Sequence, residues 1–325
     1  MPPILSRRSF LKAGLGAAVT AAVGTPATVR AANPGHDHVA TLIDIAKCVG
    51  CGACVAACHE ANAAKFPKPV KPFPKMVPGS RVPVEDWSER RDVDDRLTPY
   101  NWLFIQQAEV TVNGEAATLN IPRRCMHCIN PPCVKLCPWG AARQLDNGIS
   151  RIDDRICLGG SKCREVCPWH IPQRQTGAGL YLNLLPSMAG NGLMTKCDRC
   201  FRKVAEGGLP ACIAACPEGV QTIGPRDEIV AKARQLAAQT KGYLYGIDEN
   251  GGTNTIYLSP VPFDTLDKAI AKGPGQPHLA RVKNTMGEAN NLVAAIAIAP
   301  LAGLAAALTR SLTTAQNGKD AGDDA

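Results

Sequence analysis

The fifteen cysteines of this chain are the residues whose type and spacing can support chemistry. They fall into four blocks, and no cysteine lies outside a block. The first two blocks are Cys48-x2-Cys51-x2-Cys54-x3-Cys58 and Cys125-x2-Cys128-x4-Cys133-x3-Cys137. The last two are Cys157-x5-Cys163-x3-Cys167 and Cys197-x2-Cys200-x11-Cys212-x3-Cys216. Thiolates at such short separations are typical ligands of metal ions and of iron–sulfur clusters.

Disulfides, zinc sites and iron–sulfur clusters all use closely spaced cysteines. An odd number of cysteines with C-x2-C spacing fits a disulfide framework poorly. Zinc would explain the fourth block or the second block by itself, but it does not explain the first and third. C-x2-C-x2-C-x3-C is the spacing of bacterial ferredoxins, in which the last cysteine binds a neighbouring cluster. The spacing therefore predicts iron–sulfur clusters, and a zinc-stabilised, membrane-tethered interaction module is the remote alternative.

Composition excludes several other classes of protein. The chain has 325 residues, 45% of them hydrophobic, which excludes disorder over its whole length and a polytopic membrane protein. Its net charge of +8 gives no support for nucleic-acid binding, because four basic residues lie in the first 31 positions without any acid. No phosphate-binding glycine loop and no paired catalytic carboxylates are present. Apart from cluster ligands we expect no catalytic residue, and we expect basic side chains to help neutralise the clusters.

The two ends of the chain read as targeting segments. Residues 1–31 contain Arg7-Arg8 before Phe10-Leu11-Lys12 and a weakly apolar run, which is the pattern of a twin-arginine signal peptide. Residues 292–309 are almost uniformly apolar, and at 1.5 Å per residue they reach about 27 Å, enough for one membrane anchor. The alternative is a helix buried against the core. We predict a protein on the periplasmic side of the cytoplasmic membrane, with a polar tail at 310–325.

The four blocks in this order, with the long gap in the fourth, resemble the four-cluster iron–sulfur subunits of respiratory molybdenum enzymes and periplasmic hydrogenases. The segments 124–128, 207–212 and 251–266 are similar to the electron-transfer subunit of quinone-linked [NiFe] hydrogenases of the enterobacterial type. This resemblance implies an α+β fold with two ferredoxin-like halves and a C-terminal transmembrane helix. The expected organisation is a four-cluster domain at 32–225 with an insertion at 59–124. A C-terminal helix and an extended docking segment are expected at 226–291.

The sequence itself predicts two regular elements outside the blocks. Residues 102–112 and 116–121 flank Asn113-Gly114, a two-residue turn signal, and should form a hairpin. Residues 227–238 should form a helix.

The resemblance also implies how the cysteines are shared among clusters. The first set is Cys48, Cys51, Cys54 and Cys216, and the second is Cys58, Cys197, Cys200 and Cys212. The third set is Cys125, Cys128, Cys133 and Cys167. The fourth is Cys137, Cys157 and Cys163, with Gly160 where the family has a cysteine. Three [4Fe–4S] clusters and one [3Fe–4S] cluster are expected, or a fourth [4Fe–4S] cluster with Ser161, water or another group as ligand.

The predicted function is electron transfer without catalysis. The resemblance implies that the chain carries electrons between a periplasmic catalytic subunit, a [NiFe] hydrogenase, and an integral membrane quinone-reactive subunit. The alternative is the same role for a molybdopterin oxidoreductase such as formate dehydrogenase or a sulfur-oxyanion reductase.

Overall fold

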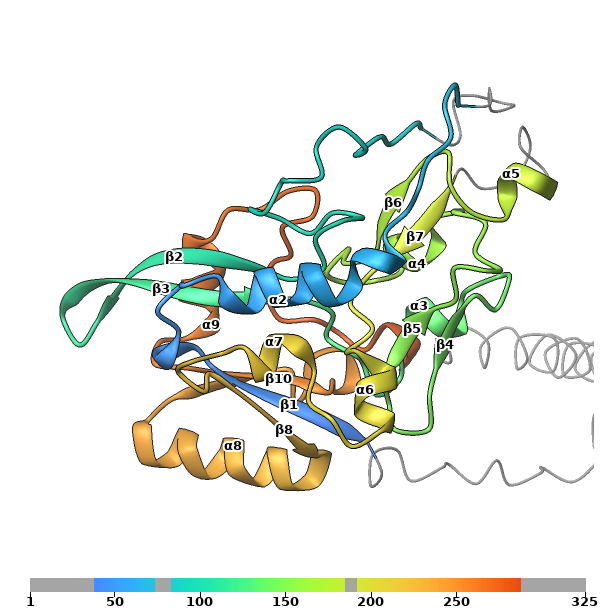
Figure 1. The fold of residues 1–325 in the computed structure, drawn as a ribbon. Coiled ribbons are helices and arrows are strands. Elements are labelled where there is room, and N and C mark those ends of the chain that lie inside the picture. The colour runs from blue at the N-terminus through green and yellow to red at the C-terminus, as the bar shows by residue number, and fades with distance from the viewer. Residues whose placement is uncertain (1–37, 74–82, 185–191, 288–325) are drawn as a thin grey trace, which may run out of the picture. The chain divides into compact units, whose positions relative to one another are not determined.

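The computed structural model describes residues 38–73, 83–184 and 192–287 (Figure 1). The predicted signal peptide at 1–31, anchor at 292–309 and tail at 310–325 lie outside these residues. Among the helices of the described ranges, none is both long and apolar enough to cross a membrane.

A four-stranded sheet combines strands from both ends of the described chain. Its strands are β1 (Val39–Asp44), β8 (Gln221–Pro225), β9 (Tyr243–Tyr245) and β10 (Thr255–Ser259). They are ordered β8-β1-β10-β9, with β1 and β10 parallel and the two outer pairs antiparallel. Thr41 lies opposite Thr255 in the parallel pair. The two central strands are therefore supplied by segments more than 200 residues apart.

The two faces of this sheet are covered differently (Figure 1). Helix α8 (Arg226–Thr240) packs on one face through Ile229 and Ala233, which contact Leu42 and its neighbours in a cluster of aliphatic side chains. Side chains alternate along a strand, so Ile43 and Tyr257 point to the opposite face. There they join the large buried cluster, which contains seven of the fifteen cysteines. The sheet thus separates an aliphatic layer from the cysteine-rich layer.

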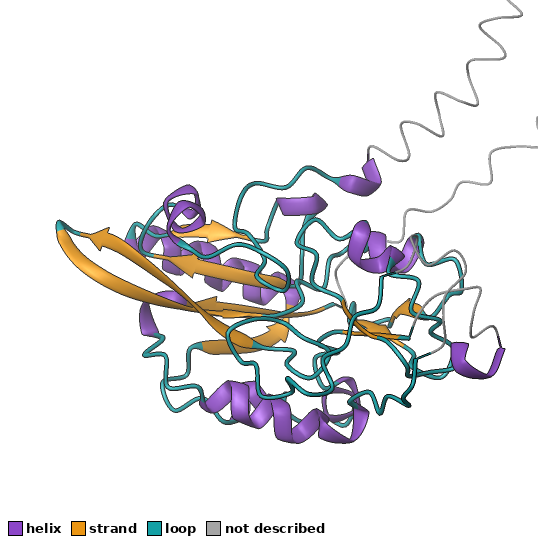
Figure 2. Cartoon of the chain, turned by 90° about the horizontal axis from the view of Figure 1, so that it is seen from above, coloured by secondary structure: helices purple, strands orange, loops and turns teal. Residues whose placement is uncertain are grey.

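A long hairpin joins the first and second cysteine blocks. Strands β2 (Phe104–Val112) and β3 (Glu115–Arg123) pair antiparallel along their whole length, and Figure 2 shows the hairpin extending from the sheet. Asn113 and Gly114 both have positive φ, 52° and 90°, as a type I′ turn requires. The predicted hairpin is confirmed. Helix α9 (Phe263–Ala269) packs beside β2, and η1 (Ile45–Lys47) lies beside β3.

The remaining elements are short. The helices are α2 (Ala53–Asn62), α3 (Pro132–Lys135), α4 (Lys162–Glu165), α5 (Tyr181–Leu184), α6 (Phe201–Ala205) and α7 (Ala211–Ala214), with 3-10 turns η2 (Ala63–Lys65) and η3 (Glu249–Gly251). Two small hairpins are formed by β4 (Ala142–Gln144) with β5 (Ser150–Ile152), and by β6 (Gln173–Gln175) with β7 (Leu193–Thr195). The mixture of helices and strands agrees with the expected α+β class.

The part of the chain after residue 225 differs from the expected helix and extended segment. The predicted helix at 227–238 is present as α8, which begins one residue earlier and ends two residues later. Beyond it, β9 and β10 enter the sheet, and β10 lies next to β1. The sequence did not indicate this pairing, because a five-residue buried strand has no periodic signal of its own. A docking role for residues 226–291 stays a prediction.

Candidate iron–sulfur site

Short helices position the last two cysteines of each block. Cys54 and Cys58 both lie on α2, and the other three blocks place their second-to-last cysteine on α3, α4 or α7. The x3 spacing puts two side chains about one helical turn apart, on the same side of the helix. Helix α2 contacts α7, and α3 contacts α4. Each pair of helices therefore faces four cysteines toward its interface.

Proline determines how far these helices run. Cys137, Cys167 and Cys216 are each followed directly by proline, and α3, α4 and α7 are four residues long. The residue before a proline disfavours the helical conformation, so the chain turns away at the last cysteine. Cys58 is followed by His59 instead, and α2 continues to Asn62.

The four blocks begin with the same turn. Two positions after the first cysteine, each block has a residue with a left-handed backbone: Gly50 (φ 74°), His127 (φ 47°), Gly159 (φ 68°) and Arg199 (φ 54°). The N–H of this residue donates to the sulfur of the first cysteine, from Gly50 to Cys48, His127 to Cys125 (3.5 Å), Gly159 to Cys157 and Arg199 to Cys197 (3.3 Å). Backbone N–H groups that point at sulfur favour its thiolate form.

Gly160 occupies the position that carries the second cysteine in the other three blocks. It follows the left-handed residue Gly159 directly, as Cys51, Cys128 and Cys200 follow theirs. A Cβ atom built on Gly160 meets no other atom within 4 Å. The hydroxyl of the next residue, Ser161, lies 3.6 Å from the sulfur of Met194. The third block therefore keeps the turn and lacks the thiol.

The cysteines of the first and fourth blocks come together in two groups. Burial raises the pKa of the Cys48 thiol, and the neighbouring thiols of Cys216 and Cys51 add to the rise. Burial also raises the pKa of Cys54 to about 12, and the thiols of Cys212, Cys48 and Cys216 add to the rise. Cys54 thus contacts both groups, and two of these three neighbours, Cys48 and Cys216, belong to the first. Cys58 lies instead beside Cys197, Cys212 and Cys200. We call Cys48, Cys51, Cys54 and Cys216 the first thiol group, and Cys58, Cys197, Cys200 and Cys212 the second.

The second and third blocks form two further groups. Cys128 interacts with Cys167, Cys133 and Cys125, which together make the third thiol group. Cys163 has Cys157 and Cys137 among its neighbours, and these three make the fourth group. Cys197 of the second group interacts with Cys125 of the third. Because α2 and α7 connect the first two groups and α3 and α4 the last two, the four groups follow one another in order.

The thiols fit iron–sulfur clusters in number and environment. All fifteen are free of disulfides, and ten of them are buried. Burial raises the pKa of the Cys133 thiol to about 11 and that of Cys167 to about 12, so burying these groups as thiolates requires a compensating positive charge. Iron supplies that charge in a cluster.

Single-ion sites need a tighter arrangement of ligands than clusters do. Within the described segments, no three side chains of His, Cys, Asp or Glu converge on a point where one metal ion could sit. Cluster ligands do not need to converge in this way, because each thiolate binds a different iron atom.

Side chains from outside the blocks donate hydrogen bonds to cysteine sulfurs. Arg124 donates to Cys212 over 3.0 Å, and Asn250 donates to Cys128 over 3.3 Å. Asn62, one turn along α2, lies 3.6 Å from the sulfur of Cys58. None of these three donors was among the predicted site residues. Arg124 had a signal, since it directly precedes a cysteine; Asn250, 122 residues from its partner, had none.

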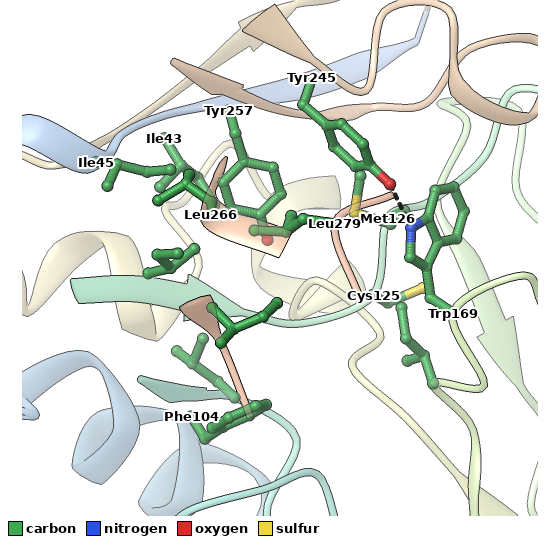
Figure 3. Packing of buried hydrophobic residues seen from close by; sticks show 14 of the residues in the cluster. Ile43, Ile45, Phe104, Cys125, Met126, Trp169, Tyr245, Tyr257, Leu266 and Leu279 are labelled. Atoms are coloured by element: carbon green, nitrogen blue, oxygen red, sulfur yellow. Dashed lines mark hydrogen bonds between the residues drawn. The ribbon is translucent and has the colours of Figure 1, made fainter. Parts of the chain in front are cut away.

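Aromatic packing covers the third group. Trp169, which follows Cys167 and a proline, is 2% exposed and belongs to the same buried cluster as Cys125. Its indole N–H donates to the hydroxyl of Tyr245 over 2.8 Å (Figure 3). Tyr245 in turn donates to the carbonyl of Ala280. This pair fixes a large apolar side chain where it keeps water from the thiols.

The first turn offers a matched test of backbone geometry. Gly50 and Gly52 have nearly equal φ, 74° and 73°, but a Cβ on Gly50 would lie 2.8 Å from the side chain of Asn120, whereas one on Gly52 meets nothing within 4 Å. Asn120 cannot easily move, because it donates to the carbonyl of Cys48. We expect Gly52→Ala to lower the free energy of unfolding by about 1–2 kcal/mol. Gly50→Ala should lower the free energy of unfolding by about 2–5 kcal/mol and reduce the iron content.

Thermal unfolding and iron analysis of the two purified variants check this expectation. Equal losses of stability and of iron in the two variants would mean that the contact with Asn120 does not constrain the turn.

Comparison with known proteins places the chain among iron–sulfur proteins. A 4Fe-4S dicluster domain matches residues 47–141, and a second 4Fe-4S dicluster domain matches residues 116–226. The hydrogenase-2 operon protein HybA of Escherichia coli O157:H7 is 30% identical over 301 residues, covering 81% of this chain and 83% of HybA. The chain belongs to the HybA family of dicluster iron–sulfur proteins.

Other members of this wider group are formate dehydrogenase subunits. The iron–sulfur subunit of the nitrate-inducible formate dehydrogenase of Escherichia coli (strain K12) is 32% identical over 228 residues, covering 68% of each chain. The iron–sulfur subunit of formate dehydrogenase-O from the same organism is 31% identical over 230 residues, covering 69% of this chain and 67% of that subunit. The HybA-family chain is therefore an iron–sulfur electron-transfer subunit, and the hydrogenase relative matches the larger part of it.

Proposed function

We propose that the four thiol groups hold four iron–sulfur clusters in a row. The first cluster is held by Cys48, Cys51, Cys54 and Cys216, and the second by Cys58, Cys197, Cys200 and Cys212. The third is held by Cys125, Cys128, Cys133 and Cys167, and the fourth by Cys137, Cys157 and Cys163. When bound, such clusters supply one-electron redox chemistry. The chain itself binds the clusters, orders them and excludes water from them.

The observation that carries this proposal is the ordered arrangement of fifteen free thiols. Helix α2 contributes Cys54 to the first group and Cys58 to the second, and α3 and α4 link the third group to the fourth in the same way. The second and third groups meet where Cys197 lies beside Cys125. The thiols of the inner two groups are mostly buried, while Cys51 at one end of the row is exposed and Cys137 at the other is half-buried. This arrangement supports electron entry and exit at the two ends.

The fourth cluster is of the [3Fe–4S] type in this proposal. Its group has three thiols, and Gly160 stands at the position of the missing ligand. The hydroxyl of Ser161 is within 3.6 Å of Met194 and 3.5 Å of Arg164, so it already has partners. A fourth iron held by Ser161 is the alternative that iron analysis distinguishes.

Electrons pass between a periplasmic catalytic subunit and an integral membrane quinone-reactive subunit in the proposed complex, and this chain catalyses no reaction itself. The relative named as a hydrogenase-2 operon protein supports a [NiFe] hydrogenase as the catalytic partner. The match to formate dehydrogenase subunits favours a molybdopterin enzyme as the second candidate. Export by the twin-arginine signal at 1–31 and anchoring by residues 292–309 complete the proposal.

Iron and acid-labile sulfide per chain, measured on anaerobically purified full-length protein, test the cluster assignment. We expect about fifteen irons and, by paramagnetic resonance, one oxidised three-iron signal beside the reduced four-iron signals. Zinc in place of iron, or fewer than four clusters at full occupancy, would contradict it.

Affinity purification of the tagged chain from detergent-solubilised membranes of its source tests the partners. Recovery of a [NiFe] large subunit supports the first candidate, and recovery of a molybdopterin subunit replaces it with the second.

A further inference from the structure

Three buried cations lie among the thiols of the two inner groups. They are Arg124 (1% exposed), Lys196 (5%) and Arg199 (1%), and each is close in sequence to a cysteine. The buried acids Asp153 and Asp198 pair with other cations, with Arg155 at 2.8 Å and Lys65 at 2.7 Å. Within the part of the chain that the structure describes, no carboxylate forms an ion pair with any of the three. Buried charges without a partner are costly, so the negative charge that compensates them must lie nearby.

Arg124 is directed at the second thiol group. Its Nη1 donates to the sulfur of Cys212 over 3.0 Å. The thiols that act on the Arg124 guanidinium are Cys212, Cys197 and Cys58. All three of these cysteines belong to the second group. An arginine is charged at any pH at which the protein folds, so it places a permanent positive charge there.

Lys196 is directed mainly at the third group. Its ammonium donates to the carbonyls of Ser150 and Cys197, which fixes its position. The thiols that act on it are Cys125, with which it forms a side-chain hydrogen bond, and Cys133 of the third group, followed by Cys197 of the second. Lys196 therefore places its charge on the third group as Arg124 does on the second.

Arg199 has a different role, because its guanidinium hydrogen-bonds to the backbone and side chains of the sheet region. It donates to the carbonyls of Val39 and Asn254 and to the hydroxyl of Thr255, which lie on or beside the central strands of the sheet. These bonds attach the fourth block to the sheet.

We propose that Arg124 and Lys196 raise the reduction potentials of the second and third clusters, respectively, and so make the middle of the row easier to reduce. The inference rests on the cluster assignment proposed above. Reduction adds one negative charge to a cluster, and a fixed cation in a low-dielectric interior stabilises the reduced form more than the oxidised form. Charge and hydrogen bonds to sulfur are known determinants of cluster potential.

Arg123 provides a matched control beside Arg124. It is equally buried, and like Arg124 it leaves two guanidinium nitrogens without a hydrogen-bond partner. As the last residue of β3 it points to the other side of the strand. It donates to the carbonyl of His278 and lies over the ring of Tyr257. The charged and polar groups that act on the Arg123 guanidinium are Tyr257, Tyr245 and Asp267, with no cysteine among them.

The test is a redox titration followed by paramagnetic resonance on the full-length, anaerobically purified protein. Signals are first assigned with Cys200→Ser for the second cluster and Cys128→Ser for the third. Arg124→Gln should lower the equilibrium constant for reducing the second cluster at least about tenfold, equivalent to about 59 mV for one electron. The other clusters should shift less. Lys196→Gln should shift the third cluster most. Arg124→Lys, which keeps the charge, should restore most of the potential.

Iron analysis on the same samples separates the possible failures. Fewer than four clusters in the unaltered protein would reject the cluster assignment, independently of the cations. Four clusters with unchanged potentials in Arg124→Gln and Lys196→Gln would overturn the present inference. If Arg124→Gln and Lys196→Gln both lose clusters while Arg123→Gln keeps them, the two cations have a structural role, and this result would also overturn the inference. Equal shifts in Arg123→Gln would show that the effect is not specific to the thiol contacts.

Discussion

Replacing Gly160 with cysteine should convert the fourth cluster from three irons to four. The turn at Gly159 already has the left-handed conformation of the other three blocks, and a Cβ on Gly160 has free space around it. The new thiol would stand where Cys51, Cys128 and Cys200 stand in their blocks. We expect one more iron per chain, loss of the oxidised three-iron signal, and a lower potential at this cluster, because an added thiolate makes it more negative.

Gly160→Ala is the control, since it adds the same Cβ without a ligand. It should leave the iron content and the three-iron signal unchanged. Ser161→Ala tests the other possible ligand and should also be silent. An unchanged iron content in Gly160→Cys would contradict the assignment of this position. The unaltered protein could instead hold four four-iron clusters. If its iron content then falls in Ser161→Ala, the serine is the fourth ligand.

Removing iron should unfold one part of the chain and leave another largely intact. The core around the fourth thiol group consists of seven buried residues, three of which are cysteines: Cys133, Ala141, Cys157, Cys163, Ala178, Leu193 and Met194. The core between α8 and the sheet contains aliphatic residues and no cysteine: Ala40, Leu42, Ile229, Ala233, Ile256 and Leu258. Metal binding contributes folding free energy where the ligands make up the core. The first core should therefore depend on iron far more than the second.

Hydrogen exchange measured by mass spectrometry, before and after anaerobic chelation under reducing conditions, checks this expectation. Amides at residues 128–184 should exchange at rates close to those of an unstructured chain, while those of β1, β10 and α8 should keep most of their protection. Uniform loss of protection would mean that the sheet also requires the clusters. Uniform retention would mean that thiol packing by itself holds the second half of the chain.

Local spacing determined much of the site. The x3 separation of the last two cysteines in each block is that of residues one helical turn apart, and α3, α4 and α7 end shortly before the prolines that follow Cys137, Cys167 and Cys216. Asn113-Gly114 likewise predicted the β2–β3 hairpin. These features depend on residues a few positions apart, so the sequence displays them directly. The absence of a thiol at Gly160 is of the same kind.

The tertiary structure decided which distant residues share an environment. Thr255 pairs with Thr41, and Asn250 donates to Cys128, although each pair is separated by more than a hundred positions. A buried strand of five residues and an isolated asparagine have no periodicity or motif that predicts their partners. The sequence also contains two adjacent arginines, 123 and 124, that look equivalent. The alternation of side chains at the end of β3 directs one to Tyr257 and the other to Cys212, and only the folded chain distinguishes them.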